Sequence, residues 1–346
     1  MSALKPVSVG IIGGAGYTGG ELLRLLAAHP HATVACATSR GRAGWPIGSI
    51  HPNLRGVLDL SLIDPQDVDP VDVLFLCLPH GETAANIEHY ASLAHRVIDL
   101  SSDFRLRDPD LYERTYGQPH PTPTWLDRFV YGLPEADRNE LMDARFISGV
   151  GCNATAMNLA LLPLARAGLI DRVIADIKVG SSESGAEPSA ASNHAERTNA
   201  LRTFAPTGHR HSAEVRQICG EFPLHVTATT TDLIRGVLAT CHVLTNRELT
   251  DKEAWQLYRN AYASEPFVRV VKERRGLYRL PEPKILAGTN FADVGFEIEP
   301  DANRVVALCA IDNLGKGAAG SAIQCMNLAC GFDETAGLTF FGLHPV

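Results

Sequence analysis

The sequence lacks the features that mark several large classes of protein. It contains no run of about 18 apolar residues, the length that a membrane-spanning helix needs. Its opening stretch MSALKPVSVG has no signal-type apolar segment. There is no Cys-x-x-Cys pair and no zinc-like histidine spacing, and the eight cysteines are scattered rather than arranged as a disulfide framework. We therefore expect a protein of the reducing cytoplasm that binds no metal and no membrane.

An excess of positive charge is absent too. The net charge of −8 argues against nucleic acid as the main ligand. With 45% apolar and 20% charged residues, the 346-residue chain has the composition of a globular protein with room for two domains. Basic residues do gather in RVVKERRGLYR (269–279), where two interpretations stay open: a solvated loop, or a docking site for an acidic ligand.

The N-terminal part of the chain alternates strand-like and helical segments. The runs VSVGII (7–12), ATVACATS (32–39), VDVLFLCLP (71–79) and HRVIDLS (95–101) are almost continuously apolar. Parallel strands that are covered on both faces have this composition. The pattern predicts an α/β fold with a doubly wound sheet.

The pattern changes after residue 152. A helical stretch at 154–167 contains Pro163, which we expect to kink the helix or restart it. Longer strand-like runs follow with few helices between them, among them HVTATTTDLIRGVLATCHVL (225–244), and they predict an α+β second domain. We therefore predict a first domain over residues 1–151, joined by a C-terminal helix at about 315–346, and a second domain over 152–314.

A glycine-rich turn joins the first strand to the first helix in VSVGIIGGAGYTGGELLRLL. Glycines spaced as G-x-x-G-x-x-G let the backbone turn tightly and approach a pyrophosphate at the helix N-terminus. A plain βα turn is the alternative. The predicted cofactor residues of this turn are Gly13, Gly14, Ala15, Gly16, Tyr17, Thr18 and Gly19.

The segment TSRGRAG (38–44) indicates which dinucleotide binds. An NAD site usually places an acid about 20 residues after the glycines, on the ribose hydroxyl. This segment has Ser39, Arg40 and Arg42 and no acid, and guanidinium and hydroxyl groups suit a 2′-phosphate. We predict NADP(H), the alternative being two arginines on a solvated loop.

Cys152 follows the glycines of SGVGCNATAMNL (148–159), where a helix is expected to begin. The helix N-terminus favours the thiolate and would lower the pKa of the thiol, and Asn153 or Thr155 could cap the helix. Packing in the core is the alternative for an isolated cysteine. The glycines and the position at the domain junction favour a nucleophile, which beside a nicotinamide suggests acyl transfer followed by hydride reduction.

Such chemistry also needs a proton carrier. TGHRHSAEV (207–215) supplies His209 and His211, and a histidine near pKa 6.5 suits acid–base work. Two surface histidines are the alternative interpretation.

Three polar loops supply further candidates. Arg105 in VIDLSSDFRL (97–106) ends a strand, where α/β sheets bind ligands; it could bind a substrate carboxylate or phosphate, or pair with Asp103. We predict substrate contacts for Arg105, Asn153, Ser182 and Arg210. The small-residue loops KVGSSESGAE (178–187) and DNLGKGAAG (312–320) suit close backbone approach, with Lys316 near phosphate or in solvent. Predicted cofactor contacts outside the first turn are Pro79, Ser184, Gly185, Asn313 and Gly317.

Several of these segments together resemble one known family. GIIGGAGYTGGELLRLL, LPHG (78–81), DLSSDFRL, VYGLPE (130–135), the Gly-Cys-x-x-Thr-Ala core at 151–156, GHRHSAE and IDNLGKGAAGSAIQCMNL occur in the order of the type 1 N-acetyl-γ-glutamyl-phosphate reductases. The resemblance runs from residue 7 to about 332. It implies that Cys152 is the catalytic cysteine, that the acid/base is His209 with His211 in reserve, and that the protein is a homodimer or homotetramer.

The segment around Cys152 departs from that family's usual pattern. Enzymes of free N-acetylglutamyl phosphate usually read Gly-Cys-Tyr-Pro-Thr-Ala, whereas this chain has Asn153 and Ala154. GVGCNATA and SSESGAEPSAASNHAERTNALRTF (181–204) resemble the branch that reduces phosphorylated aminoadipate held by its amino group on a small acidic carrier protein. Arginines at 197, 202, 210, 274 and 275 would then steer an acidic partner.

The resemblance implies reductive dephosphorylation of an acyl phosphate to a semialdehyde, with release of inorganic phosphate, in lysine or arginine biosynthesis. Three alternatives remain: the arginine-pathway enzyme acting on free N-acetylglutamyl phosphate, a cysteine hydrolase that binds no nucleotide, and a non-catalytic NADP-sensing regulator.

Overall fold

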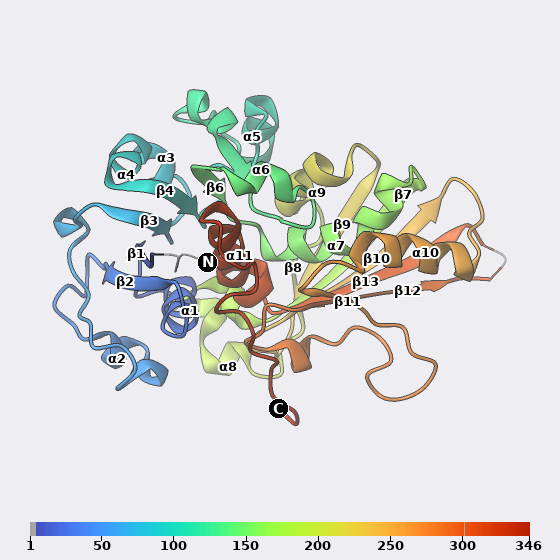
Figure 1. The fold of residues 1–346 in the computed structure, drawn as a ribbon. Helices are drawn as coiled ribbons and strands as arrows, with labels where there is room; N and C mark the ends of the chain where they lie inside the picture. Colours follow the sequence, from blue (N-terminus) through green and yellow to red (C-terminus); the bar gives the residue numbers. More distant parts are fainter. Residues whose placement is uncertain (1–4, 301) are drawn as a thin grey trace. The chain divides into compact units, whose positions relative to one another are not determined.

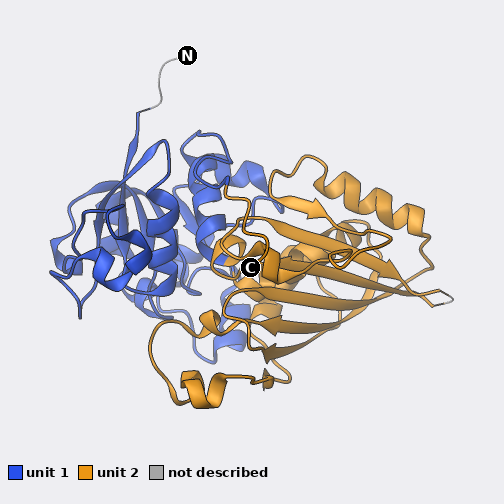
Figure 2. Ribbon diagram, turned by 90° about the horizontal axis from the view of Figure 1, so that it is seen from below, with its two compact units in different colours: residues 1–150, 318–339 blue, residues 151–317, 340–346 orange. Residues whose placement is uncertain are grey.

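The chain divides into two compact units (Figure 2). Unit 1 comprises residues 1–150 and 318–339, and unit 2 comprises residues 151–317 and 340–346. The computed structural model describes residues 5–300 and 302–346, so residues 1–4 of the predicted first domain and residue 301 of the predicted second lie outside the described residues. Among the described residues, none of the helices is both long and apolar enough to cross a membrane.

Unit 1 is built on a six-stranded sheet in the order β2-β1-β3-β4-β6-β5, with every pair of neighbours parallel. This confirms the predicted doubly wound sheet. The chain changes direction across the sheet between β1 and β3, and α/β folds bind their ligands at such a switch point. The strands are β1 (Val7–Ile12), β2 (Ala32–Ala37), β3 (Val71–Leu76), β4 (Ala94–Asp99), β5 (Phe129–Tyr131) and β6 (Phe146–Ser148). The helices are α1 (Tyr17–Leu26), α2 (Ile47–Ile50), α3 (Glu82–Ala85), α4 (Ile87–Leu93), α5 (Pro109–Tyr116), α6 (Arg138–Met142) and α11 (Gly320–Ala329).

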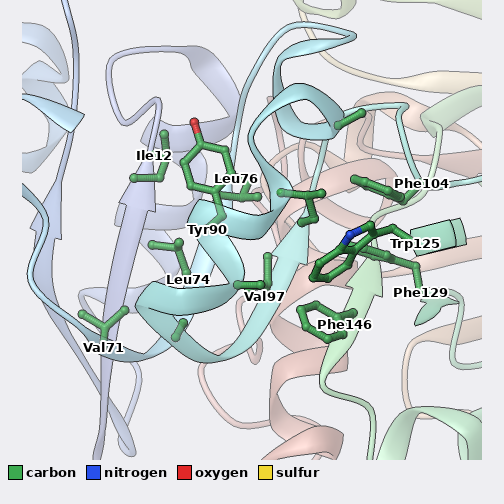
Figure 3. Close-up of a cluster of buried hydrophobic side chains, with 14 of the residues drawn as sticks. Ile12, Val71, Leu74, Leu76, Tyr90, Val97, Phe104, Trp125, Phe129 and Phe146 are labelled. Atoms are coloured by element: carbon green, nitrogen blue, oxygen red, sulfur yellow. The ribbon is translucent and has the colours of Figure 1, made fainter. Parts of the chain in front are cut away.

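One apolar cluster joins this sheet to the helices and loops that cover it. Figure 3 shows Leu74 and Val97 from the strands beside Tyr90 of α4, with Trp125 and three phenylalanines further along. The rings of Phe104 and Phe129 stack with their centroids 4.0 Å apart. Burial of such side chains is the main stabilising contribution in a core of this kind.

Unit 2 contains a seven-stranded sheet in the order β11-β12-β13-β10-β7-β9-β8, which mixes parallel and antiparallel pairs. The predicted α+β second fold is thereby confirmed. Figure 1 shows this sheet with α7, α9 and α10. The strands are β7 (Ile170–Val179), β8 (Arg202–Ala205), β9 (Leu224–Thr230), β10 (Val237–Thr245), β11 (Val268–Val270), β12 (Ala292–Ile298) and β13 (Arg304–Ile311). The helices are α7 (Cys152–Arg166), α8 (His194–Arg197), α9 (His211–Cys219) and α10 (Asp251–Tyr262).

The strand-like run 225–244 is two strands rather than one. β9 and β10 lie on opposite sides of β7, the first parallel and the second antiparallel to it. The chain turns between them at residues 231–236, where Gly236 has a φ of +125° that a side chain would disfavour.

The expected restart at Pro163 is wrong, because α7 runs unbroken from Cys152 to Arg166. Proline has no N–H to donate to the carbonyl four residues earlier, which belongs to Leu159. The hydroxyl of Tyr262 on α10 donates to that carbonyl oxygen at 2.6 Å. A side chain from another helix therefore supplies the missing hydrogen bond.

Candidate functional site

The glycine-rich turn lies at the switch point of the unit 1 sheet. Gly13 has a φ of +85°, and a Cβ there would lie 2.3 Å from the carbonyl oxygen of Cys77. A Cβ on Gly19 would lie 2.5 Å from the carbonyl oxygen of Gly13. Helix α1 then begins after Gly16 with no described side chain capping it. The bare backbone and the helix N-terminus fit the pyrophosphate of a dinucleotide cofactor.

Thr38, which we did not predict, holds this turn in place. Its carbonyl oxygen accepts from the N–H of Gly14 at 2.9 Å, and its hydroxyl lies 3.3 Å from the N–H of Gly13. Beyond it, Arg40 and Arg42 are exposed, and Arg40 pairs with Glu82 at 2.8 Å. The segment after β2 thus exposes two cationic groups, of which Arg40 already has a carboxylate partner.

Asp103 orders the loop that contains Pro79. Its carboxylate accepts from the N–H groups of Gly81 and Ala84 at 2.7 and 2.9 Å and pairs with His80 at 2.8 Å. The guanidinium of Arg105 donates to the carbonyl oxygen of Ser101 at 3.0 Å.

Asp99 is a fully buried acid at the end of β4. It accepts hydrogen bonds from the backbone and hydroxyl of Ser101 and from the hydroxyl of Thr83. Burial, with a further contribution from the negative charge of Asp103, raises the pKa of Asp99 to about 7.

In unit 2, Cys152 is the first residue of α7 and is half-buried. The predicted cap by Asn153 or Thr155 is wrong, since Gly151 occupies the N-cap and no side chain caps it. The hydroxyl of Thr155 instead donates to the carbonyl oxygen of Gly151 at 3.0 Å. The N–H of Gly151 donates at 2.9 Å to Glu214, a buried acid on α9.

Asn153 connects the thiol to two ionisable groups. Its amide nitrogen donates to Glu183 Oε1 at 3.1 Å and lies 3.4 Å from Nε2 of His209. The Sγ of Cys152 lies 3.7 Å from Oδ1 of Asn153 and 4.0 Å from Oε1 of Glu183. Cysteine, amide, carboxyl and imidazole therefore form one cluster in unit 2.

Burial changes the proton affinity of both ionisable groups in this cluster. Burial raises the pKa of Glu183, against smaller opposing effects of Arg210 and Asn153. Burial and the charge of Arg210 lower the pKa of His209, while Glu214 opposes them. At neutral pH His209 is therefore uncharged, the form in which an imidazole accepts a proton.

The two candidate histidines have different neighbours. His209 precedes α9, and its Nδ1 accepts the backbone N–H of His211 at 3.2 Å. His211 begins α9, where its Nε2 lies 3.9 Å from Glu214. The two rings lie edge to face at 4.8 Å. Of the two, His209 contacts Asn153 and so borders the cysteine.

The small-residue loops pack around the same cluster. Ser182 donates to the carbonyl oxygen of Ile234 at 2.7 Å and accepts from Asn313 at 2.8 Å. Ser184 and Gly185 are exposed. A Cβ on Gly317 would lie 2.7 Å from the Cβ of Cys152, so the turn after β13 contacts the cysteine directly. The turn is π-helical (Gly315–Ala319), and Asp312 accepts two of its neighbouring N–H groups.

The predicted site residues lie in both units: the Gly13–Gly19 turn, Ser39, Arg40, Arg42, Pro79 and Arg105 belong to unit 1, and the others belong to unit 2. The acids Glu183 and Glu214 were missed, although both lie within segments that we singled out. A carboxyl flanked by serines in a small-residue loop was the available signal for Glu183.

Two family models cover most of the chain. The NAD binding domain of the semialdehyde dehydrogenases matches residues 8–144, and the dimerisation domain of the same family matches residues 152–313. The chain belongs to the semialdehyde dehydrogenase family. This confirms the predicted oxidoreductase class and the dinucleotide-binding first domain.

Individual relatives within the semialdehyde dehydrogenase family indicate which branch of it this chain resembles. LysW-L-2-aminoadipate 6-phosphate reductase of Deinococcus radiodurans is 48% identical over 98% of this chain and 98% of its own. LysW-L-2-aminoadipate/LysW-L-glutamate phosphate reductase of Saccharolobus solfataricus is 43% identical over 98% of this chain and 99% of its own. The resemblance to the carrier-dependent branch is thereby confirmed. Aspartate semialdehyde dehydrogenase II of Vibrio cholerae shares the fold, with a TM-score of 0.71 at 16% identity over 94% of this chain and 98% of that one.

Proposed function

We propose that the protein reduces carrier-linked 2-aminoadipate 6-phosphate to the semialdehyde, with NADPH as reductant and inorganic phosphate as the second product. The observation that carries this proposal is the set of relatives named for LysW-linked aminoadipate phosphate, matched over nearly the full chain. Asn153, which differs from the tyrosine usual in enzymes of the free acetylated substrate, contacts both Glu183 and His209 and supports it.

The cluster in unit 2 provides the groups that this reaction needs. The thiolate of Cys152 attacks the acyl carbon, the bond to the phosphate oxygen breaks, and a thioester forms. Bound NADPH would supply a hydride to the thioester carbon. His209 transfers the proton of the substrate oxygen when the resulting thiohemiacetal releases the semialdehyde and the sulfur. The backbone N–H groups at the start of α7, which have no partner within the helix, would be the donors to the oxyanion.

The choice of NADPH rests on the segment after β2. It presents Ser39, Arg40 and Arg42 and has no acid that would repel a 2′-phosphate. The Gly13–Gly19 turn would hold the pyrophosphate.

The substrate arrives on a small acidic carrier protein, which we equate with the LysW of the relatives' names. Arg210, Arg274 and Arg275 are exposed and suit an acidic partner. Arg197 and Arg202 suit it less, because Arg197 donates to Thr230 and to the carbonyl oxygen of Thr231, and Arg202 to that of Glu196. A rate that does not change with salt would argue against this steering.

We also propose a homodimer or homotetramer, supported by the dimerisation-domain match over residues 152–313. The face of the sheet opposite α7 suits such contacts: along β10, alternate residues are fully buried and half-exposed.

The test is the reverse reaction, followed as NADPH absorbance with NADP⁺ and phosphate. One sample contains aminoadipate semialdehyde linked to the carrier, and the other contains free N-acetylglutamate semialdehyde. We expect turnover with the carrier-linked aldehyde and none with Cys152→Ser, which should still bind NADPH. Efficient turnover of the free acetylated aldehyde alone would instead make the protein an enzyme of arginine synthesis.

A further inference from the structure

Glu183 is an acid in the immediate surroundings of the nucleophile that the reaction outlined above does not use. It lies in the short turn Ser181–Ser184 that follows β7. Its Oε1 is 4.0 Å from the Sγ of Cys152, the outer limit for a hydrogen bond donated by a thiol, and 3.1 Å from the amide nitrogen of Asn153. A permanently charged carboxylate at this distance would disfavour the thiolate that the chemistry needs.

We propose that Glu183 is the group that takes the proton from the Cys152 thiol, with Asn153 as the positioning residue that holds the carboxyl beside the sulfur. The S–H bond breaks, its electron pair stays on the sulfur, and the proton forms an O–H bond with the carboxylate. The pair keeps one negative charge throughout, so the thiolate forms without a second anion beside it. When the thiohemiacetal releases the semialdehyde, the proton returns to the sulfur.

Two observations support this assignment. The carboxyl contacts the reacting sulfur, whereas the Nε2 of His209 contacts the amide of Asn153. Burial raises the pKa of Glu183 and, together with the charge of Arg210, lowers the pKa of His209. The carboxylate is therefore a stronger base than a carboxylate ordinarily is, and the imidazole is a weaker base than an imidazole ordinarily is. His209 is then left for the proton transfer at the substrate oxygen, a different step.

The amide of Asn153 is oriented by both of its neighbours. Its nitrogen donates to the carboxyl, and its oxygen faces the thiol at 3.7 Å. The side chain is fully buried, so no water competes for these contacts. A tyrosine at this position has neither an amide donor nor an amide acceptor, which separates this chain from the usual sequence of its free-substrate relatives.

The thiol's reactivity toward iodoacetamide, measured from pH 5 to pH 10, tests the proposal without substrate or carrier. Other ionisable groups of unit 2 lie in the segments around this cluster, and they stay unchanged when the wild type is compared with Glu183→Gln. They are His209 and Arg210 before α9, His211 and Glu214 on α9, and Asp312 and Lys316 in the turn after β13.

In the wild type, the alkylation rate should rise in two steps. The first follows the loss of one proton from the Cys152–Glu183 pair, and the second follows full ionisation of the thiol at alkaline pH. Glu183→Gln should lose the first step, so that alkylation at pH 7 slows by about tenfold or more, while the rates at pH 10 stay within about twofold of each other. Glu183→Asp keeps a carboxyl and should retain a first step of reduced amplitude.

His209→Asn tests the rival assignment of this role to the imidazole, and under the present proposal the variant keeps both steps of the alkylation profile. Alkylation of Glu183→Gln at pH 7 as fast as in the wild type, or faster, would overturn the proposal, because the carboxylate would then only repel the thiolate. Loss of the first step in His209→Asn but not in Glu183→Gln would assign the role to the imidazole. NADPH binding and thermal unfolding report whether each variant folds. If Glu183→Gln does not fold, the same alkylation profile is measured for Glu183→Asp and Asn153→Ser.

The proposal rests on the proposed function only for its place in the reaction. Failure of the reverse reaction with carrier-linked aldehyde would change the substrate and leave the alkylation profile as evidence for the proton acceptor. A profile without the first step would remove Glu183 from this role and leave the substrate assignment intact.

Discussion

The hydroxyl of Tyr262 lies 2.6 Å from the carbonyl oxygen of Leu159, the carbonyl that Pro163 leaves without its helical N–H. Without this hydroxyl, the carbonyl of Leu159, four residues before the proline, would be a buried acceptor with no donor. Helix α7 is also the helix that begins with Cys152. The tyrosine thus allows a proline within the helix that supports the nucleophile.

We expect Tyr262→Phe to lower the free energy of unfolding by about 1–3 kcal/mol, because the Leu159 carbonyl is then buried without a partner. Pro163→Ala restores an N–H to that carbonyl, so the double variant should recover most of the loss. Tyr258→Phe is the matched control: its hydroxyl donates to Ala160, whose carbonyl keeps the helical N–H of Leu164. Urea unfolding gives the free energy of unfolding of the two tyrosine variants, of Pro163→Ala and of the double variant. Equal losses of this free energy in the two tyrosine variants would contradict the explanation.

Gly317→Ala should reduce turnover by about ten- to a hundredfold with NADPH binding unchanged. Its methyl group would lie 2.7 Å from the Cβ of Cys152 and 3.2 Å from the carbonyl oxygen of Asp312, so the cysteine must shift. The comparison is kcat against the dissociation constant for NADPH. A wild-type kcat in the variant would mean that the turn shifts to accommodate the methyl group and that Cys152 keeps its position.

Arg42→Ala should weaken NADPH binding by about tenfold and change NADH binding little, since only NADPH carries the 2′-phosphate. Arg40→Ala should have a smaller effect, because Arg40 pairs with Glu82 at 2.8 Å. Glu82→Gln releases Arg40 and should strengthen NADPH binding. Fluorescence titration with each cofactor measures the two dissociation constants. Equal losses of affinity for NADH and NADPH would mean that the arginines do not bind the 2′-phosphate.

Asp99 should make the stability of the protein depend on pH. Its pKa is raised to about 7 in the fold, from an ordinary value of 3.8. Between these two values the folded state binds more protons than the unfolded state, so this contribution to stability is present below about pH 4 and is lost as pH rises toward 7.

Asp99→Asn removes the titrating group and keeps an acceptor for Ser101 and Thr83. From pH 5 to pH 8, the wild type should lose about 3 kcal/mol of unfolding free energy relative to the variant. Urea unfolding at the two pH values provides the comparison. Parallel pH curves for the two proteins would mean that Asp99 keeps an ordinary pKa.

Local signals in the sequence were sufficient for the backbone of the site. The apolar runs 7–12 and 71–79, the spacing of the glycines, and a cysteine at a helix start each depend on neighbours along the chain, and the structure has the expected strands, turn and helix there. The fold class follows from these because parallel strands alternating with helices have few ways to pack.

Contacts between distant segments were beyond such signals. Asn153 was expected to cap α7, yet its amide bonds to Glu183, 30 residues away. The helix through Pro163 depends on a tyrosine about a hundred residues further on, and the break between β9 and β10 depends on both strands pairing with β7. Each outcome was decided by a partner that the local pattern does not contain.

The division into two units has a consequence for synthesis on the ribosome. The chain enters unit 2 at residue 151, returns to unit 1 at residue 318, and ends in unit 2. Helix α11, which completes unit 1, therefore emerges only after residues 151–317 have been made, a delay of roughly 10–30 s at about 5–20 residues per second. During that interval the surface of α1 and α6 that α11 will cover stays open. Unit 1, although begun first, is therefore completed only after most of unit 2 has been made, and chaperones have a long interval in which to act on it.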